Sequence, residues 1–345
     1  MTANISIQPS GHAFLVEKDE TILEGALRSG LNLNYHCSNG TCGECKARIV
    51  SGAAGQILHH DYVLSAQDKT QNKILLCRAH AASDMVLEAS EAGSVDDIPV
   101  QQLTTQVHKA EFPVEDVAMI TLRTPRSQTL RFFAGQHITL RLNGLKPRNK
   151  SISSCPCNGM YLQFHQRRVE GDEFSDYIFS RLKQREKIAV EGPYGGFVLD
   201  EASKRPAIFI AYDTGFSPIK SVIEHAISLD VPQAIRLYWI TRKLSAHYLA
   251  NYCRSWESAL DDFSYLPLTS NLDQLVDSDV ESDELDPDER AMVQTAKRVI
   301  QDYPDLSGHD VYVNGPQTVL QVMRKLLLDH GLPVDRLFID TLKRY

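Results

Sequence analysis

Four of the seven cysteines of this chain lie between residues 37 and 77. They are Cys37, Cys42, Cys45 and Cys77. The first three follow the spacing C-x4-C-x2-C, and the fourth stands farther along, which is typical of a loop that wraps a [2Fe–2S] cluster. Gly40 and Gly43 stand in the loop, where the backbone must approach the cluster sulfurs closely. The pattern therefore predicts a one-electron iron–sulfur centre held by these four thiolates.

Three other interpretations compete with a cluster. A structural zinc site would pair C-x2-C with a second such pair or with histidines, and no second pair lies near Cys77. A disulfide framework is typical of small secreted chains, whereas residues 1–18 have neither the basic start nor the apolar core of a secretory signal. Chance clustering of buried thiols is the third alternative, and it leaves the agreement of spacing and glycines unexplained.

The elements around the cysteines form a recognisable order. Residues 5–16 predict a hairpin, and residues 46–50 predict a strand. Thr21 and Glu24 make a capping box, so we expect a short helix over residues 21–29 that ends before Gly30. Strand, strand, helix, cluster loop and strand resemble the β-grasp fold of plant-type ferredoxins over about the first 90 residues. Such a domain needs an electron donor and an electron acceptor.

The remainder of the chain changes its hydrophobic period twice. Between residues 103 and 199, short alternating runs separated by glycine and proline predict an antiparallel barrel, with one helix over residues 175–182 and Ser175 as its N-cap. After Arg205, continuous apolar runs alternate with helical segments, which predicts an α/β domain with a parallel sheet. The segment 273–289 carries nine acidic residues and no basic one, so we expect a solvated insertion.

A barrel followed by an α/β domain, with a ferredoxin in front, resembles the ferredoxin–NADP reductase superfamily. Within it, the chain is similar to the single-chain reductases of ring-hydroxylating oxygenases and to CDP-6-deoxy-glucoseen reductases, over nearly its whole length. The resemblance is carried by FAGQH at 133–137, RNKS at 148–151, GPYGGF at 192–197, TGFSP at 214–218 and GP at 315–316.

The resemblance implies that FAD binds at the RNKS segment. In the family, an Arg-x-Tyr-Ser signature neutralises the flavin pyrophosphate with its arginine and hydrogen-bonds the isoalloxazine edge with its serine. Arg148 and Ser151 match these two positions, Asn149 fills the variable one, and Lys150 replaces the stacking tyrosine. A lysine cannot stack as an aromatic ring does, although its charge would stabilise a reduced anionic flavin.

The resemblance also implies a second phosphate-binding element at the start of the helix near residue 173. Gly171 and Ser175 lie in this element, where free helix amides attract anions. Arg167 and Arg168 add positive charge nearby, and a solvated strand end explains both arginines equally well.

The nucleotide signatures depart from the family pattern. Relatives place Gly-Gly-Thr-Gly-x-x-Pro after the first parallel strand, and this chain keeps Thr214, Gly215 and Pro218 but has Tyr212 and Asp213 in place of two glycines. If these two side chains faced the ligand, the first would block close approach and the second would repel a pyrophosphate. The family's Cys-Gly-Pro reads Asn314, Gly315 and Pro316 here. Arg242 and Lys243 follow the second strand as a site for an adenosine phosphate or as ordinary surface cations.

These observations define the expected architecture, a multidomain α+β and α/β chain. We expect a β-grasp ferredoxin domain over 1–92, a linker over 93–101, an antiparallel β-barrel FAD domain over 102–200 and an α/β NAD(P)-binding-like domain over 201–345 with the insertion 273–289. Cys155-Pro156-Cys157 reads as a proline-centred turn with incidental cysteines, since nothing nearby lowers a thiol pKa. Cys253 reads as a packing residue of a helix.

Composition limits the class of protein. The chain has 345 residues, 43% of them hydrophobic and 23% charged, as in an ordinary globular protein of two or three domains. A net charge of -8 argues against non-specific binding to nucleic acid. The longest uninterrupted apolar run, 207–212, is far shorter than the about 20 residues that a membrane span needs. We expect a cytoplasmic protein.

Taken together, these features predict an iron–sulfur flavoprotein reductase. It passes electrons from NADH or NADPH through FAD to the [2Fe–2S] cluster and on to a partner protein, an oxygenase or dehydratase component. The alternative is an electron-carrier or docking subunit that keeps the cluster but has lost efficient NAD(P)H oxidation. A third hypothesis is an oxidoreductase that acts directly on a small molecule such as free flavin. No acid–base or nucleophilic catalytic set is expected.

Overall fold

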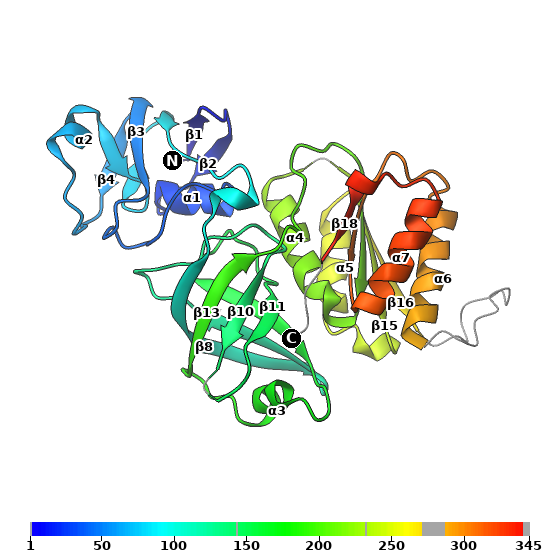
Figure 1. Cartoon of the computed structure of the whole chain (residues 1–345). Helices are drawn as coiled ribbons and strands as arrows, with labels where there is room; N and C mark the ends of the chain where they lie inside the picture. The colour runs from blue at the N-terminus through cyan, green and yellow to red at the C-terminus, as the bar shows by residue number, and fades with distance from the viewer. Residues whose placement is uncertain (1, 143, 232, 271–286, 341–345) are drawn as a thin grey trace.

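The computed structural model describes residues 2–142, 144–231, 233–270 and 287–340. The chain forms three lobes in sequence order (Figure 1). The N-terminal sheet sits above a β-barrel, and an α/β domain lies beside the barrel.

The N-terminal lobe is a five-stranded sheet in the order β2-β1-β7-β3-β5. Its strands are β1 (Ala3–Gln8), β2 (Ala13–Val16), β3 (Lys46–Ser51), β5 (Lys73–Leu75) and β7 (Met85–Glu88), and a two-stranded sheet joins β4 (Ala54–Ile57) to β6 (Ala79–Ala81). The expected hairpin is confirmed, since β1 pairs antiparallel with β2, and β7 then adds parallel to β1. The small helix α2 (Ala66–Thr70) precedes β5.

Helix α1 (Ile22–Arg28) forms where its capping box predicts. The Thr21 hydroxyl accepts the Glu24 amide at 3.3 Å, and the Glu24 carboxylate accepts the Thr21 amide at 2.8 Å. Its apolar face, with Ile22, Leu23 and Ala26 all buried, packs on the sheet beside the cysteine loop.

The barrel is a six-stranded antiparallel sheet in the order β11-β10-β13-β8-β9-β12. Its elements are β8 (Gln101–Val114), β9 (Val117–Arg123), β10 (His137–Arg141), β11 (Arg148–Ser151), β12 (Tyr161–Arg167), α3 (Glu173–Ser180) and β13 (Lys187–Tyr194). The expected N-cap of the helix is wrong: Asp172 is the N-cap, and its carboxylate accepts the Ser175 amide at 2.7 Å. Aspartate is the stronger cap because it brings a negative charge to the helix N-terminus. Strand β8 begins at Gln101, the last residue of the expected linker.

The C-terminal lobe has a parallel sheet in the order β16-β15-β14-β17-β18. Its elements are β14 (Ala207–Tyr212), α4 (Phe216–Ser228), β15 (Ile235–Thr241), α5 (Ala250–Ala259), β16 (Phe263–Thr269), α6 (Pro287–Asp302), β17 (Asp310–Asn314), α7 (Gln317–Asp329) and β18 (Leu337–Ile339). Short 3-10 turns occur at Val95–Asp97, Asp213–Gly215, Leu244–Ala246 and Val334–Arg336.

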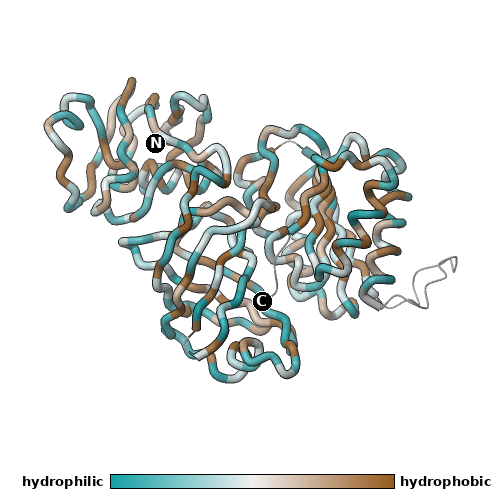
Figure 2. Tube along the Cα trace, in the orientation of Figure 1, coloured by the Kyte–Doolittle hydropathy of each residue, from teal (hydrophilic) through white to brown (hydrophobic). Residues whose placement is uncertain are grey.

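The parallel sheet is covered on both faces, which explains its continuous apolar strands. Along β14, Phe209 and Ala211 pack into the core with α4, whereas Ile208 and Ile210 pack into the core with α6 and α7. Figure 2 shows apolar residues concentrated along these strands.

Most of the expected acidic insertion lies outside the described residues. Its last three positions, 287–289, are not part of a loop but begin α6. Proline at the first helical position and acidic residues in the first turn both favour a helix start there. Among the described helices, none is long and apolar enough to cross a membrane.

Candidate functional site

The four thiols of the N-terminal domain meet as two pairs. The Cys42 amide donates to the Cys37 sulfur at 3.4 Å, and the thiols of Cys45 and Cys77 lie close enough to shift each other's pKa. The Cys37 thiol interacts electrostatically with both members of the second pair, so the four sulfurs share one neighbourhood. Within the described residues, no three metal-ligating side chains surround a single point. Four cysteine thiolates are the ligand set of a plant-type [2Fe–2S] cluster.

The four thiols differ in pKa: those of Cys37 and Cys45 are lowered, whereas that of Cys42 is raised by burial and that of Cys77 by the neighbouring Cys45 thiol. Burial raises the pKa of the Cys37 thiol, but hydrogen bonds from the side chain and amide of Cys42 and from the Asn39 amide lower it to about 6. The Glu44 amide donates to the Cys42 sulfur at 3.4 Å. Backbone amides directed at the sulfurs stabilise negative charge, as the cluster requires.

The glycines of the loop are required by its geometry. Gly40 and Gly43 have φ of 77° and 78°. A Cβ at these positions would lie 2.6 Å from the His60 side chain and 2.3 Å from the Tyr62 ring. The loop is thus covered closely by the segment 57–63, whose Tyr62 amide donates to the Gly40 carbonyl at 3.0 Å.

The residues on either side of Cys37 bind the barrel. The His36 carbonyl accepts the Thr129 amide at 2.9 Å, and the Ser38 amide donates to the Arg126 carbonyl at 3.0 Å. Next to them, the Arg131 guanidinium donates to the Asn34 side chain at 2.6 Å. These contacts hold the cysteine loop against the barrel. No sequence pattern indicated them, because each partner lies about 90 positions away.

On the barrel, β11 presents two cations to the start of α3. Alternation along the strand places Arg148 and Lys150 on one face. Arg148 forms an ion pair with Asp172, and the Lys150 ammonium lies 5.3 Å from the centre of the Phe174 ring. The Asn149 side chain accepts the Thr139 hydroxyl at 2.8 Å, so it ties β11 to β10. The structure therefore brings Arg148 and Lys150 to the expected phosphate element.

The backbone just before α3 is open on the side of Gly171. Gly171 has a φ of 73°, and a Cβ added to it would meet no atom within 4 Å, so the space beside it is open. The fully buried Ser175 hydroxyl instead accepts the Val169 amide at 2.8 Å and holds the turn. On the neighbouring strand, the buried Gln166 Oε1 has no hydrogen-bond partner among the described residues. Open backbone, two cations and an unsatisfied buried oxygen fit the binding of a large polar cofactor such as FAD.

Arg167 lies elsewhere. Its guanidinium forms ion pairs with Asp213 of the α/β domain and with Asp116 of the β8–β9 turn. The structure thus pairs Arg167 with carboxylates at the domain boundary rather than with the start of α3.

The other face of β11 meets a carboxylate that the sequence reasoning missed. The Ser151 hydroxyl donates to Asp340 Oδ2 at 3.1 Å, and the Asn314 amide donates to the same oxygen at 2.8 Å. Asp340 is 5% exposed and follows β18. It joins the expected flavin serine to the expected nucleotide asparagine. The only sequence signal for it was an acidic residue directly after a short apolar run.

The structure shows where the two unusual residues of the turn after β14, Tyr212 and Asp213, direct their side chains. Tyr212 is 3% exposed and packs in the core between the sheet and α6, so its ring does not block the turn. The Asp213 carboxylate faces Arg167 of the barrel. Gly215 is needed because a Cβ there would lie 2.6 Å from the Asn314 carbonyl. Thr214 is half-buried, and Pro218 is buried in the first turn of α4.

The second nucleotide signature lies beside this turn. Asn314 ends β17, Gly315 follows it, and Pro316 is the N-cap residue of α7. Thr214, Gly215, Asn314 and Pro316 therefore meet at the carboxyl ends of the parallel strands, where sheets of this type bind ligands. Arg242 and Lys243 are exposed at the carboxyl end of β15.

Helix α4 ties the α/β domain to β11 and the residues that follow it. The Ser217 hydroxyl, the Lys220 ammonium and the Ser221 hydroxyl donate to the carbonyls of Ser151, Ser153 and Ser154, at 3.2, 3.1 and 2.7 Å. These donors are spaced i, i+3 and i+4, so they lie on one face of the helix.

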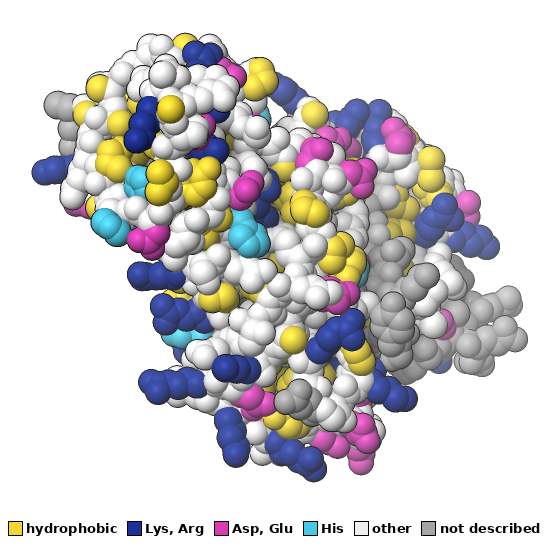
Figure 3. Space-filling view, turned by 60° about the vertical axis from the view of Figure 1, so that its left-hand side comes forward, with side chains coloured by type: hydrophobic (Ala, Val, Ile, Leu, Met, Phe, Trp, Pro, Cys, Tyr) yellow, Lys and Arg dark blue, Asp and Glu magenta, His cyan; other side chains and the backbone are white. Residues whose placement is uncertain are grey.

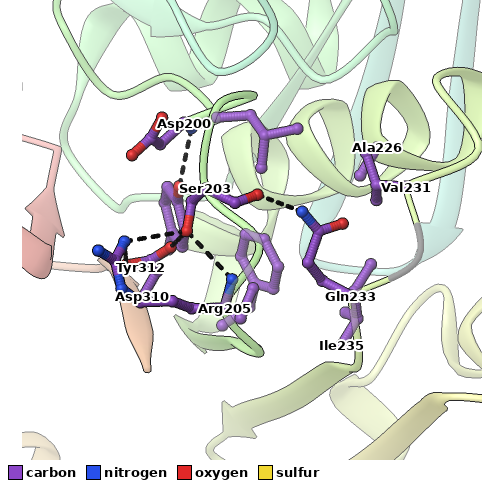
Figure 4. Close-up of a pocket in the computed structure, with 12 residues that line it drawn as sticks. Asp200, Ser203, Arg205, Ala226, Val231, Gln233, Ile235, Asp310 and Tyr312 are labelled. Atoms are coloured by element: carbon purple, nitrogen blue, oxygen red, sulfur yellow. Dashed lines mark hydrogen bonds and ion pairs between the residues drawn. The ribbon is translucent and has the colours of Figure 1, made fainter. Parts of the chain in front are cut away.

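The cavity at the opposite end of the parallel sheet is small and structural. It holds about 20 Å³, which is room for one water molecule. Figure 4 shows Ser203 at its centre, bonded to Asp310, to the Arg205 amide at 3.2 Å and to the Gln233 side chain. These bonds tie the amino ends of the strands together, far along the sheet from the ligand-binding end.

The remaining cysteines divide into two kinds. Cys155 and Cys157 form a disulfide, so they are paired rather than incidental. Cys253 of α5 is fully buried, as expected of a packing residue, and burial raises its pKa to about 12.

The surface also differs between domains. In Figure 3, hydrophobic and histidine side chains lie close together on the N-terminal domain, and Lys and Arg side chains follow the edge of the barrel below it. On the segment that covers the cysteine loop, Ile57 and Val63 are 47% and 81% exposed.

A β-grasp sheet with two pairs of thiols, a barrel with a basic strand and a parallel α/β sheet define an electron-transfer flavoprotein of the ferredoxin reductase class. Comparison with known proteins agrees. Residues 5–82 match the family of the 2Fe-2S iron-sulfur cluster binding domain, and residues 104–199 match that of the oxidoreductase FAD-binding domain.

Relatives align along the whole chain. The CDP-6-deoxy-L-threo-D-glycero-4-hexulose-3-dehydrase reductase of Yersinia pseudotuberculosis is 30% identical over 99% of this chain and 98% of its own. The terephthalate 1,2-dioxygenase reductase component 1 of Comamonas is 28% identical over 99% and 97%. Among solved structures, an Amycolatopsis cytochrome P450 reductase has a TM-score of 0.61 at 22% identity, covering 99% and 98%. The chain belongs to this family of [2Fe–2S] reductases with an FAD-binding domain.

Proposed function

We propose that this chain is the reductase component of a two-protein system whose second member is an oxygenase or a dehydratase. Relatives that match over their full length are named as reductases of a dehydrase and of a dioxygenase, which supports this class of acceptor. We divide the chain into modules at 1–92, 102–200 and 201–345, joined by a linker at 93–101. When bound, FAD supplies the conversion of a two-electron hydride from NAD(P)H into single electrons for the cluster.

The residues proposed for each ligand follow from their positions. We assign the cluster to Cys37, Cys42, Cys45 and Cys77. We assign the flavin to Arg148, Asn149, Lys150, Ser151, Gly171 and Ser175, and we keep Arg167 in this set although it lies at the domain boundary. We assign the nucleotide to Thr214, Gly215, Pro218, Asn314, Gly315 and Pro316. Ser175 and Asn149 act by shaping the turn and the strand, since their side chains bond within the barrel. Asp340 orients the Ser151 hydroxyl and the Asn314 amide from one buried oxygen.

The observation that carries this proposal is the docking of the cysteine loop on the barrel. His36 and Ser38, which flank the first proposed cluster ligand, hydrogen-bond to Thr129 and Arg126. The one-electron centre is thereby held against the flavin domain, as transfer of electrons between them requires. A carrier that received its electrons from another protein would have no need to bury this side of its cluster loop.

Lys150 has a different task from the tyrosine it replaces. It lies on the same strand face as Arg148 and next to the first turn of α3, so its charge adds to the phosphate-binding element. We assign Lys150 to the flavin diphosphate rather than to the isoalloxazine ring.

An anaerobic reduction experiment tests the proposed function. Purified protein with measured iron and FAD content is mixed with NADH, then with NADPH, and the visible spectrum is followed. We expect one nucleotide to bleach the flavin and cluster bands within seconds. If dithionite reduces both chromophores and neither nucleotide does, the chain is an electron carrier or docking subunit and the reductase proposal fails.

A further inference from the structure

The ion pair between Asp213 and Arg167 crosses the boundary between the α/β domain and the barrel. Arg167 Nε donates to Asp213 Oδ2 at 2.7 Å, and a second guanidinium nitrogen contacts Oδ1, so the pair is bidentate. The side chain of Asp213 is 18% exposed and that of Arg167 is 21% exposed. Bidentate pairs between arginine and carboxylate are among the stronger ones, and partial burial protects this pair from screening.

The backbone of Asp213 has an unusual conformation. Its φ is 52°, in the left-handed region that suits glycine, and its carbonyl accepts the Trp239 indole N–H at 3.0 Å. Trp239 is fully buried and stacks on Phe216 at 4.0 Å. Aspartate tolerates positive φ better than most residues, so this side chain uses the conformation of a glycine turn to reach the barrel.

The pair lies where the proposed nucleotide site must be entered. Asp213 directly precedes Thr214 and Gly215 of the turn, and Arg167 is the last residue of β12, an edge strand of the barrel sheet. A dinucleotide diphosphate approaching the turn brings negative charge to a place already occupied by a carboxylate and its partner. It therefore either separates the pair or leaves Asp213 as a like charge beside it.

We propose that Asp213 and Arg167 form a latch between the domains that competes with pyridine nucleotides, so that Asp213 determines how tightly this reductase binds NAD(P)H. The inference rests on the proposed function and adds to it a residue that limits nucleotide affinity. In the latched state Arg167 neutralises Asp213. In the nucleotide-bound state Arg167 is released toward the diphosphate.

The affinity of the oxidised nucleotide tests the latch. NAD+ and NADP+ are titrated into the holoprotein, and dissociation constants are measured by calorimetry and by the flavin difference spectrum. The variants are D213N, which keeps a residue suited to positive φ, D213G, which restores the relatives' glycine, and D116N as a control. Asp116 binds the same arginine but lies on the barrel's own turn, so its loss leaves the domain boundary intact.

We expect D213N and D213G to bind nucleotide about tenfold more tightly than the wild type, which is the factor that applies if about one molecule in ten of the wild type is unlatched. The dissociation constant of D116N for the nucleotide should remain within about twofold of the wild-type value. If the wild type binds nucleotide and neither Asp213 variant binds it more tightly than D116N, the latch is refuted while the reductase function stands. If the wild type and all variants bind neither nucleotide, the reductase function fails, and the latch with it.

Discussion

Arg131 fastens the cluster domain to the barrel, and its removal should separate the two cofactor sites functionally. Its guanidinium donates to Asn34 Oδ1 at 2.6 Å, reaches the Asn32 carbonyl at 3.5 Å and lies 6.0 Å from the centre of the Tyr35 ring. A hydrogen bond from a charged donor contributes about 1.5 to 3 kcal/mol, and a cation–π contact about 0.5 to 2 kcal/mol, more as it is buried. Burial lowers the pKa of Arg131, so the cost of desolvating its charge offsets part of this gain.

We take about 2 kcal/mol as the net contribution, which corresponds to roughly a thirtyfold change in the docking equilibrium. The Thr129 and Ser38 hydrogen bonds remain in Arg131→Ala, so electron transfer from flavin to cluster should fall several-fold, with about thirtyfold as the limit. Arg123→Ala is the matched control, since Arg123 is exposed on the same barrel.

Two electron acceptors separate the steps. Ferricyanide accepts electrons from the flavin directly, whereas cytochrome c is expected to receive them through the cluster. Arg131→Ala should lower cytochrome c reduction and leave ferricyanide reduction unchanged, and Arg123→Ala should change neither. Equal ratios of the two rates in wild type, Arg131→Ala and Arg123→Ala would refute the assigned role of this contact.

Three further predictions concern the flavin site, acid stability and the thiols. Arg148→Ala should weaken FAD binding by at least about tenfold, and Lys150→Met should weaken it less, measured as the FAD retained after dialysis. Equal retention in both variants and the wild type would contradict the proposal that the cations of β11 bind FAD. Burial lowers the pKa of His137 to about 4, below the value of about 6.5 in the unfolded chain. The neutral imidazole therefore contributes about 2 kcal/mol of stability above pH 6.5, after allowing for partial exposure, and this contribution is lost as the pH falls from 6.5 to 4. In His137→Gln, the free energy of unfolding measured in urea should depend less steeply on pH between about 4 and 6.5 than in the wild type. The same pH dependence in both proteins would contradict the assigned role of His137. Alkylation of unfolded, iron-free protein should modify five cysteines without reductant and seven with it; seven in both cases excludes the Cys155–Cys157 disulfide.

Local patterns predicted the elements well and the contacts between domains poorly. The Thr21 capping box, the alternating runs of the barrel and the buried β14 each depend on neighbours in the chain, so their period and caps were readable. The expected cap Ser175 was wrong because Asp172, three positions earlier, competes for the same helix start.

The candidate site shows the same division. The cysteine spacing over 37–45 and the Arg148–Ser151 segment could be singled out because each is one short stretch of chain, and their ligand assignments stay predictions. Asp340 and the partner of Asp213 were not, because Ser151 and Asp340 are 189 positions apart and Arg167 and Asp213 are 46 apart. Hydrophobic periodicity carries no information about such distant pairs. The replacement of an expected glycine by Asp213 did, however, indicate that a cation lies nearby.

The three hydrogen bonds from α4 to the carbonyls of β11 and the residues after it have a mechanical consequence. Ser217 lies two residues after the turn that contains Gly215, and it bonds to the carbonyl of Ser151 itself. A shift of that turn therefore reaches the backbone of β11 directly through Ser217. If FAD binds at β11 as proposed, a ligand at the turn should change the absorption spectrum of the flavin without exchanging an electron.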